Sequence, residues 1–405
     1  NDPSNQTYLT NKVEIQGGGN LLVDAGGDLQ GGMFYVDGGR AELNVDGSVT
    51  YGSFKSAAIN QMNPILAMGD AVFDITAGRD LALQAVIDPM ILPQPGNKKP
   101  DLSSIFFRYG EKSAVSLTAL TGNITLGNDV GAVIDFVNNR RAIPVSFTGT
   151  ARDSVSVAPS SLKAFALNGN IHFKDSMILY PSSQGEFELF AAGDILGGGL
   201  GNQVNVTMSD TQQSLLPSVK NPAASYTDAS LRLVLNGISN EIDKIHAPRA
   251  VHEADPLPAL ISTRHGDIIG IDPFQFILPK PTQVMAGRDV RNVSLQFQHN
   301  RSEAESLISA GRDFKFDIVR SPSTGALVNV VQRVEVSGPG RLTVLAGRHV
   351  DLGSSEGITT VGNQINTALD ENGAAIDVLA GLGQSRLAVD DFIKHYVSDQ
   401  GLIQP

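Results

Sequence analysis

Short runs of alternating hydrophobic and polar residues fill most of the chain, and many of them meet at a glycine. In LISAGRDFKFDIV (307–319), three apolar residues after the glycine alternate with Lys315 and Asp317, which is the two-residue period of a half-buried β-strand. The same pattern recurs in FDITAGRDLALQAV (73–86) and LTVLAGRHVDLG (342–353). Helix signals are scarce, and the best candidate is SRLAVDDFIKHYVSD near the end of the chain. The pattern therefore predicts an all-β protein.

The glycines that separate the strands belong to one repeated motif. It reads AGRD at 77–80, 286–289 and 310–313, with the variants AGGD (25–28), AAGD (191–194) and AGRH (346–349). We expect the alanine to face a tight interior and the glycine to turn the chain through a positive φ, with the aspartate capping N–H groups of that turn. Arginine and aspartate should lie outside and form ladders between neighbouring repeats. An alternative is that stacked Arg-Asp pairs contact carbohydrate. The candidate structural residues are Gly26, Asp28, Gly78, Asp80, Gly193, Asp194, Gly287, Arg288, Asp289, Gly311, Arg312, Asp313, Gly347 and Arg348.

Repetition of strand, corner and strand is typical of a solenoid, in which each repeat packs on its neighbours. A leucine ladder is missing, so a parallel β-helix fits better than a leucine-rich repeat. We predict one solenoid over residues 1–405, with coils of roughly 20–25 residues. Roughly 16–20 such coils at about 4.8 Å each would form a rod on the order of 80–95 Å long.

Proline-rich stretches interrupt the pattern. Proline cannot donate to a strand ladder, so these segments are expected to leave the helix as side loops, where specific recognition usually resides. The predicted loops cover about 87–104, 205–228, 244–261 and 273–283.

Composition narrows the class of protein further. The chain has 405 residues, no cysteine and no tryptophan, and its formal net charge is −12. Disulfides and thiolate metal sites are excluded, and the negative charge argues against nucleic acid as a partner. The start of the chain, NDPSNQTYLT, has neither a basic region nor an apolar region of a signal peptide. If the protein is secreted, we expect this chain to be a piece of a longer precursor.

Candidate chemistry is sparse. His246, His252, Glu253 and Asp255 lie in one loop and suggest a metal site, but Pro248 and Pro256 disturb any helical spacing, and a solvated polar loop is the favoured interpretation. GGGLGN (197–202) lacks the lysine of a phosphate loop, and the chain has no GxSxG nucleophile elbow. The sequence therefore predicts no catalytic residue, no cofactor and no metal, and the protein is not expected to be an enzyme.

Corners of the AGRD type, together with LTGNITLGN (120–128), resemble the filamentous haemagglutinin family of two-partner secretion exoproteins. VEVSGPGRLTVLAGRHVDLGSSEGITTVGNQIN (334–366) is similar to a late module of large members of that family. The resemblance covers about 284–395 most specifically, is looser from about 17 to 200 and is poor over roughly 205–260. It implies a right-handed parallel β-helix that a dedicated outer-membrane barrel transporter exports from a Gram-negative bacterium. The family's N-terminal secretion domain is not matched, and the resemblance offers no catalytic residues.

The expected function is that of a structural and adhesive segment of a large secreted bacterial surface exoprotein. It would form a rigid cell-surface rod or filament for adhesion or biofilm formation, with surface glycans or host cells as further partners. Two alternatives remain: a polysaccharide-binding or polysaccharide-cleaving β-helix, and a stalk that presents a toxin domain. Two outcomes are also open for the ends, namely a capping helix over 385–399 or head-to-tail pairing of end strands with another copy.

Overall fold

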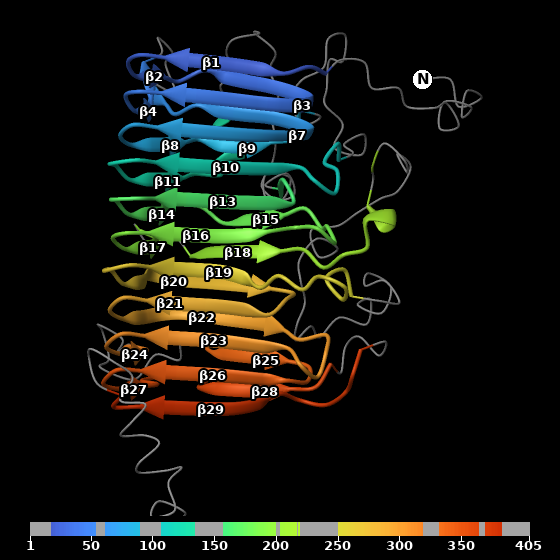
Figure 1. The fold of residues 1–405 in the computed structure, drawn as a ribbon, viewed down its shortest axis with the longest axis vertical. Helices are drawn as coiled ribbons and strands as arrows, with labels where there is room; N and C mark the ends of the chain where they lie inside the picture. The colour runs from blue at the N-terminus through green and yellow to red at the C-terminus, as the bar shows by residue number, and fades with distance from the viewer. Residues whose placement is uncertain are drawn as a thin grey trace, which may run out of the picture.

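The protein is all-β, and its strands stack into a parallel β-helix (Figure 1). The computed structural model describes residues 18–53, 61–89, 107–133, 157–199, 203–216, 218, 250–318, 332–363 and 369–382. Within these ranges no helix is long and apolar enough to cross a membrane. The helical segments in these ranges are short, and they include residues 130–133 and the 3₁₀ turn η4 (Gln213–Leu215).

One face of the helix is a 12-stranded sheet, which we call the long sheet. Successive strands pair in parallel, although each belongs to a different coil. Eleven of them lie side by side in chain order from one end to the other (Figure 1). In that order they are β1 (Leu21–Ala25), β3 (Met33–Val45), β7 (Ile65–Ala77), β10 (Ala114–Ala119), β13 (Ser161–Ala166), β16 (Phe187–Ala191), β19 (Ala259–Thr263), β21 (Thr282–Ala286), β23 (Glu305–Ala310), β26 (Arg341–Ala346) and β29 (Ala375–Ala380). The twelfth strand, β9 (Ala85–Ile87), pairs with the start of β7.

The other strands form a 15-stranded sheet that is arranged as two columns. The first column follows the corner motif: β2 (Leu29–Gln30), β4 (Val49–Thr50), β8 (Leu81–Leu83), β11 (Ile124–Leu126), β14 (Ile171–Phe173), β17 (Ile195–Gly197), β20 (Ile268–Leu278), β22 (Val290–Gln298), β24 (Phe314–Lys315) and β27 (Val350–Asp351). The second column holds β12 (Val157–Ala158), β15 (Met177–Leu179), β18 (Val204–Met208), β25 (Val334–Ser337) and β28 (Ile358–Val361). The long strands β20 and β22 cross both columns. A small antiparallel pair, β5 (Gly52–Ser53) and β6 (Gln61–Met62), lies outside this scheme.

The interior is apolar and continuous because inward residues of neighbouring coils stack in register. The alanine before each corner glycine illustrates this, since Ala77 pairs with Ala119 and Ala310 pairs with Ala346, and all four are buried. Larger side chains fill the space between the sheets, where Phe173, Phe274 and Phe276 of the 15-stranded sheet pack ring against ring with one another and with Phe187 of the long sheet. The expectation that the alanine faces a tight interior is confirmed.

The coils are longer and fewer than the sequence suggested. From one corner to the equivalent position in the next coil the chain advances 20 residues between Asp28 and Ser48, but 73 residues between Asp194 and Asp267. Eleven strands of the long sheet span ten steps of about 4.8 Å, so the described part of the rod is about 48 Å long. The predicted rod on the order of 80–95 Å is wrong for these residues, because some coils use far more than 20–25 residues of the chain for one step of rise.

Three of the predicted side loops are partly strand. The 273–283 loop is wrong: β20 runs through Pro273 to Leu278, and β21 begins at Thr282. Proline is tolerated there because the pairing of β20 with β22 shifts register between Ile269 and Phe274, so that no ladder bond is lost. Pro279 and Pro281 mark the bend between the two strands.

The other loop predictions have mixed outcomes. The start of the 205–228 loop belongs to β18, whose Val206 and Met208 are buried, and the end of the 244–261 loop belongs to β19. The 87–104 loop begins where β9 ends, and its residues after Pro89 lie outside the described residues. The capping helix predicted over 385–399 also lies outside them.

A buried histidine gives the fold a dependence on pH. His299 is fully buried, its Nδ1–H donates to the Pro339 carbonyl (2.8 Å), and its Nε2 accepts from the Ser306 hydroxyl (2.8 Å). Burial lowers the pKa of His299, although the hydrogen bond to Pro339 acts in the opposite direction. The neutral ring is therefore the form that the fold requires.

Acidification should accordingly remove stability through this residue. Because its pKa is lower in the folded chain than in the unfolded one, His299 contributes fully above about pH 6.5 and progressively less below it. The free energy of unfolding, measured in urea, should fall more between pH 7.5 and pH 5.5 for the wild type than for His299→Asn. Equal losses in both proteins would contradict this assignment.

Candidate functional site

The corner glycines are required by close backbone approach between coils. A Cβ added to Gly78 would lie 2.1 Å from the Asp46 carbonyl oxygen, and one added to Gly311 would lie 2.3 Å from the Gly287 carbonyl oxygen. None of Gly78, Gly193, Gly287 and Gly311 has a positive φ. The expected reason for these glycines was therefore wrong, because the constraint comes from the coil below and not from the turn itself.

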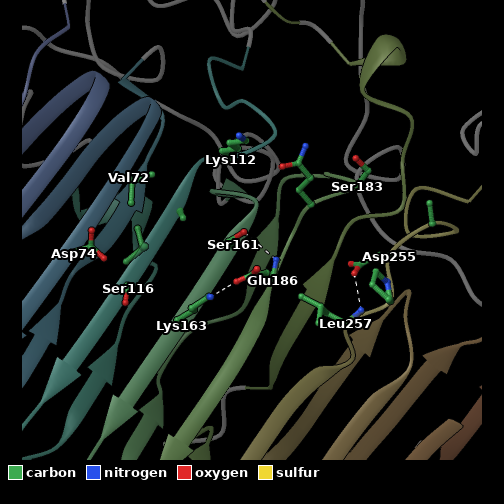
Figure 2. Close-up of a pocket in the computed structure, with 15 residues that line it drawn as sticks. Val72, Asp74, Lys112, Ser116, Ser161, Lys163, Ser183, Glu186, Asp255 and Leu257 are labelled. Atoms are coloured by element: carbon green, nitrogen blue, oxygen red, sulfur yellow. Dashed lines mark hydrogen bonds and ion pairs between the residues drawn. The ribbon is translucent and has the colours of Figure 1, made fainter. Parts of the chain in front are cut away.

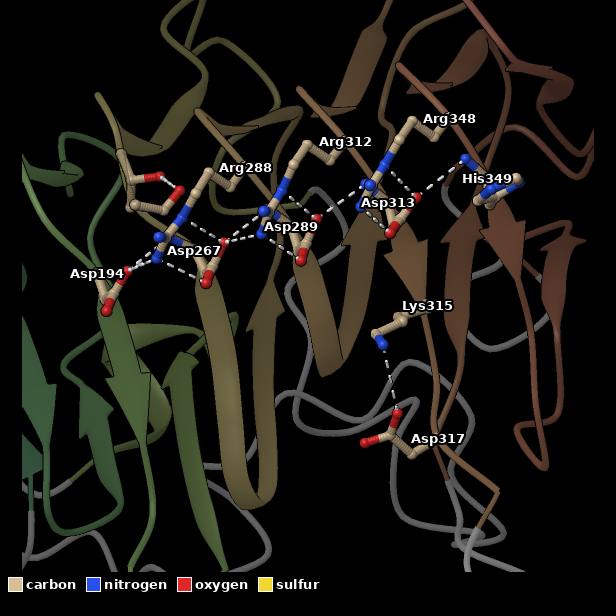
Figure 3. A network of polar contacts seen from close by, with 12 residues as sticks. Asp194, Asp267, Arg288, Asp289, Arg312, Asp313, Lys315, Asp317, Arg348 and His349 are labelled. Atoms are coloured by element: carbon tan, nitrogen blue, oxygen red, sulfur yellow. Dashed lines mark hydrogen bonds and ion pairs between the residues drawn. The ribbon is translucent and has the colours of Figure 1, made fainter. Parts of the chain in front are cut away.

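Each corner carboxylate or amide accepts an N–H of the following coil (Figure 3). Asp289 Oδ1 accepts from the N–H of Asp313 (3.0 Å), and Asp313 Oδ1 in turn accepts from the N–H of His349 (3.2 Å). The series runs Asp80, Asn123, Asn170, Asp194, Asp267, Asp289, Asp313 and His349, and Asp28 makes the same bond to Ser48. We call this series the corner ladder. The aspartates cap the next coil, whereas the sequence suggested that they cap their own turn.

Arginines reinforce the ladder in its C-terminal half. Arg288 contacts Asp267 (2.8 Å) and Asp194 (3.0 Å), so one guanidinium bridges two coils. Arg312 contacts Asp289 (2.7 Å), and Arg348 contacts Asp313 (2.5 Å) (Figure 3). Burial alone would lower the pKa of Arg288, but Asp267 and Asp194 raise it. The expected Arg-Asp ladder between repeats is therefore present at these corners.

The candidate residues named from the sequence all lie at the junction of the long sheet and the first column. Gly26 and Asp28 follow β1, and Arg79 of the third coil pairs with Asp28 (2.7 Å). Hydrogen bonding from the Ser48 N–H is the main reason that the pKa of Asp28 is lowered. Gly347 and Arg348 follow β26. Their shared task in the structure is contact between coils.

Substitutions in the ladder should separate backbone capping from ion pairing. Asp289→Ala leaves the Asp313 N–H without its acceptor and should destabilise the fold by about 1–3 kcal/mol. Arg312→Ala removes a partly exposed ion pair and should cost less than about 1 kcal/mol. Denaturant unfolding of both variants checks the order, and a larger loss for Arg312→Ala would refute it.

A groove of about 670 Å³ lies on the outer face of the long sheet. Its floor is formed by outward side chains of three neighbouring strands, Asp74 of β7, Ser116 of β10 and Lys163 of β13, which are in register (Figure 2). Lys163 forms an ion pair with Glu186. Lys112, Ser183 and Leu257 lie along its rim (Figure 2). The groove thus offers hydroxyl groups and both signs of charge to a ligand.

A buried charge cluster holds one wall of this groove. The turn that carries Asp255 and Leu257 belongs to the excursion before β19. The Asp255 carboxylate accepts from His252 Nδ1 (3.1 Å) and from the ammonium of Lys280, whose side chain is 1% exposed. Lys280 also donates to the Gly185 carbonyl (3.2 Å). Although burial alone would raise the pKa of Asp255, hydrogen bonds from His252 and Lys280 hold it well below its usual range.

The metal hypothesis for this loop receives no support from its geometry. Of its four residues, His246 lies outside the described residues, while His252 and Asp255 do meet. The third member of the cluster is Lys280, whose ammonium donates hydrogen bonds and cannot ligate a metal. Among the described residues no group of three or more histidines and carboxylates is arranged to hold a metal ion.

Sequence reasoning missed both the groove and Lys280. The groove is built from coils that are far apart along the chain, and a lysine between two prolines carries no sequence signal for burial. Searches of this chain against protein-family models, curated proteins and solved structures found no match.

Proposed function

We propose that the chain is a structural and adhesive segment of a large secreted bacterial surface exoprotein. In this proposal the β-helix is a rigid extracellular rod, or part of a filament, that serves adhesion or biofilm formation. Export through an outer-membrane barrel transporter of a Gram-negative bacterium would follow from the resemblance to the filamentous haemagglutinin family.

The observation that carries this proposal is that the residues of the recurring motif make contacts between neighbouring coils. Its aspartates cap the next coil, its glycines admit the neighbouring backbone, and its arginines bridge carboxylates of successive coils. Because the side chains of the motif are used for contacts between coils, a mechanical role is favoured over a chemical one. The apolar interior, whose side chains stack in register from coil to coil, supports the same conclusion.

Two measurements test the mechanical and adhesive parts separately. Single-molecule pulling on the two ends should unravel the rod in steps, each releasing the residues of one or more coils. Beads coated with the chain should attach to biofilm-forming bacteria or epithelial cells more than albumin-coated beads do. Smooth extension at low force would refute the rod, and attachment equal to albumin on every surface would refute adhesion.

The groove favours a second candidate, a polysaccharide-binding or polysaccharide-cleaving module. Its hydroxyl and charged side chains repeat at the spacing of successive strands, about 4.8 Å, which suits a linear polymer that lies along the rod. Incubation with bacterial exopolysaccharides tests this candidate. Retention without cleavage indicates binding, and release of reducing or unsaturated ends indicates an enzyme. If the chain neither retains nor cleaves any of the polysaccharides, this candidate is eliminated.

A further inference from the structure

The outward face of the long sheet changes character along the rod. At the outward position next to the corner, the N-terminal strands carry Asp24, Asn44, Thr76 and Thr118. From β13 onward, the same row reads Phe165, Phe190, Ser262, Met285, Ser309, Leu345 and Leu379. Met285 is 37% exposed, and the other six side chains are half-buried. The C-terminal part of this face is therefore a mainly apolar stripe, and its side chains remain partly accessible among the residues that the structure describes.

The order of apolar and serine positions in the stripe is the same from both ends when Met285 of β21 is taken as its centre. Ser262 mirrors Ser309, one strand to either side. Phe190 mirrors Leu345, and Phe165 mirrors Leu379, at two and three strands from the centre.

The row two residues earlier on each strand follows the same symmetry, except at Glu188 and Thr343. It reads Lys163, Glu188, Leu260, Gln283, Leu307, Thr343 and Asp377 from β13 to β29. Gln283 is the centre, Leu260 mirrors Leu307, and the terminal positions Lys163 and Asp377 have opposite charges.

A second pair of charges extends the match. Glu186 lies just before β16 and Arg341 begins β26, two strands to either side of the centre. Within one chain, Glu186 pairs with Lys163 and Arg341 pairs with Asp377.

We propose that this face binds a second copy of the chain, with the two rods side by side and antiparallel. A two-fold axis parallel to β21 keeps each row opposite itself and reverses the order of the strands, as an isologous interface requires. Phe190 of each copy then lies opposite Leu345 of the other, and Met285 meets its own counterpart. At each end, Lys163 of one copy lies opposite Asp377 of the other, and Glu186 lies opposite Arg341, so that these four charges face opposite ones.

The size of the face suits such a pair. Seven strands at about 4.8 Å, with three outward residues each, give a surface of about 34 Å by about 20 Å. Two copies would bury roughly 1,400 Å², which lies within the range of about 1,200–2,000 Å² for specific interfaces. A parallel pair of rods centred on the middle row fits less well, because its axis would place Phe190 opposite Glu186 and Leu345 opposite Arg341.

Sedimentation velocity from about 1 to 200 µM tests the proposal. The wild type should show a reversible monomer–dimer equilibrium that stops at the dimer. Met285→Lys places two ammonium groups at the axis and should weaken dimerisation at least tenfold, whereas Thr76→Lys, in the same row outside the stripe, should leave it unchanged. Far-UV circular dichroism of both variants controls for folding.

A cross-link reports the geometry directly, because the chain has no native cysteine. Met285→Cys should be joined into a covalent dimer by a short bis-maleimide, and Thr76→Cys should not. A monomer at 200 µM, growth beyond the dimer, or an equal response of the two positions would overturn the proposal. Since the pairing does not depend on adhesion, beads that fail to attach would leave it standing.

Discussion

Lys280→Met should lower the free energy of unfolding by about 3–5 kcal/mol, because it leaves the Asp255 carboxylate buried without its cation. Both side chains are nearly inaccessible, at 1% and 8% exposure, so water cannot replace the lost ammonium. The turn that walls the groove should loosen at the same time. Urea unfolding at pH 7 measures the first effect, and proteolysis near Leu257 measures the second.

Lys315→Met is the matched control. Lys315 faces Asp317 at 3.9 Å, and both side chains are about one-third exposed. An exposed pair of this kind contributes little, so the control should lose less than about 1 kcal/mol. Equal losses in the two variants would show that the Lys280 cluster has no special role.

The contribution of Asp255 should also depend on pH. Because its pKa is lower in the folded chain than in the unfolded one, its stabilisation is complete above about pH 4 and is lost as the pH falls further. The stability difference between the wild type and Asp255→Asn should therefore shrink between pH 7 and pH 3. A difference that stays constant or grows on acidification would contradict the assignment.

Gly311→Ala and Gly78→Ala should each destabilise the rod by about 1–3 kcal/mol, since a methyl group forces two backbones apart. Gly27→Ala tests whether any loss of glycine matters, because a Cβ there meets nothing within 4 Å. That variant should be neutral or slightly stabilising. Thermal unfolding of the three proteins decides the point, and an equal loss in Gly27→Ala would show that the close approach of neighbouring coils is not the cause.

The local sequence pattern was sufficient to predict the strands and the corners. It was not sufficient to predict why the corners require glycine. The period-2 runs around Gly311 predict strands on either side, and β23 and β24 lie there. The absence of positive φ at this glycine could not be foreseen, because the clash that excludes a side chain comes from Gly287 in the preceding coil. Knowledge of which coil lies below which was needed.

Proline was misleading for a related reason. Whether Pro273 breaks a strand depends on whether its neighbours need an N–H there, and the register shift between β20 and β22 removes that need. The burial of Lys280 likewise depends on Asp255, which reaches it from an excursion of the preceding coil. The symmetry about Met285 appears only once the register of seven strands is known.

The central claim is that each coil, whatever its length in residues, lengthens the rod by one strand spacing. Distances between paired spin labels test this claim most directly. Labels at Thr76, Thr118 and Ser309 all occupy the outward row of the long sheet. With unlabelled protein in excess, the Thr118–Ser309 distance should centre near five spacings, about 24 Å, and the Thr76–Ser309 distance near six, about 29 Å. A difference of one spacing between the two pairs, despite the long coil between Thr76 and Thr118, is the result that the stacked helix predicts. Distances that follow sequence separation, or that are broad and indistinguishable, would contradict it.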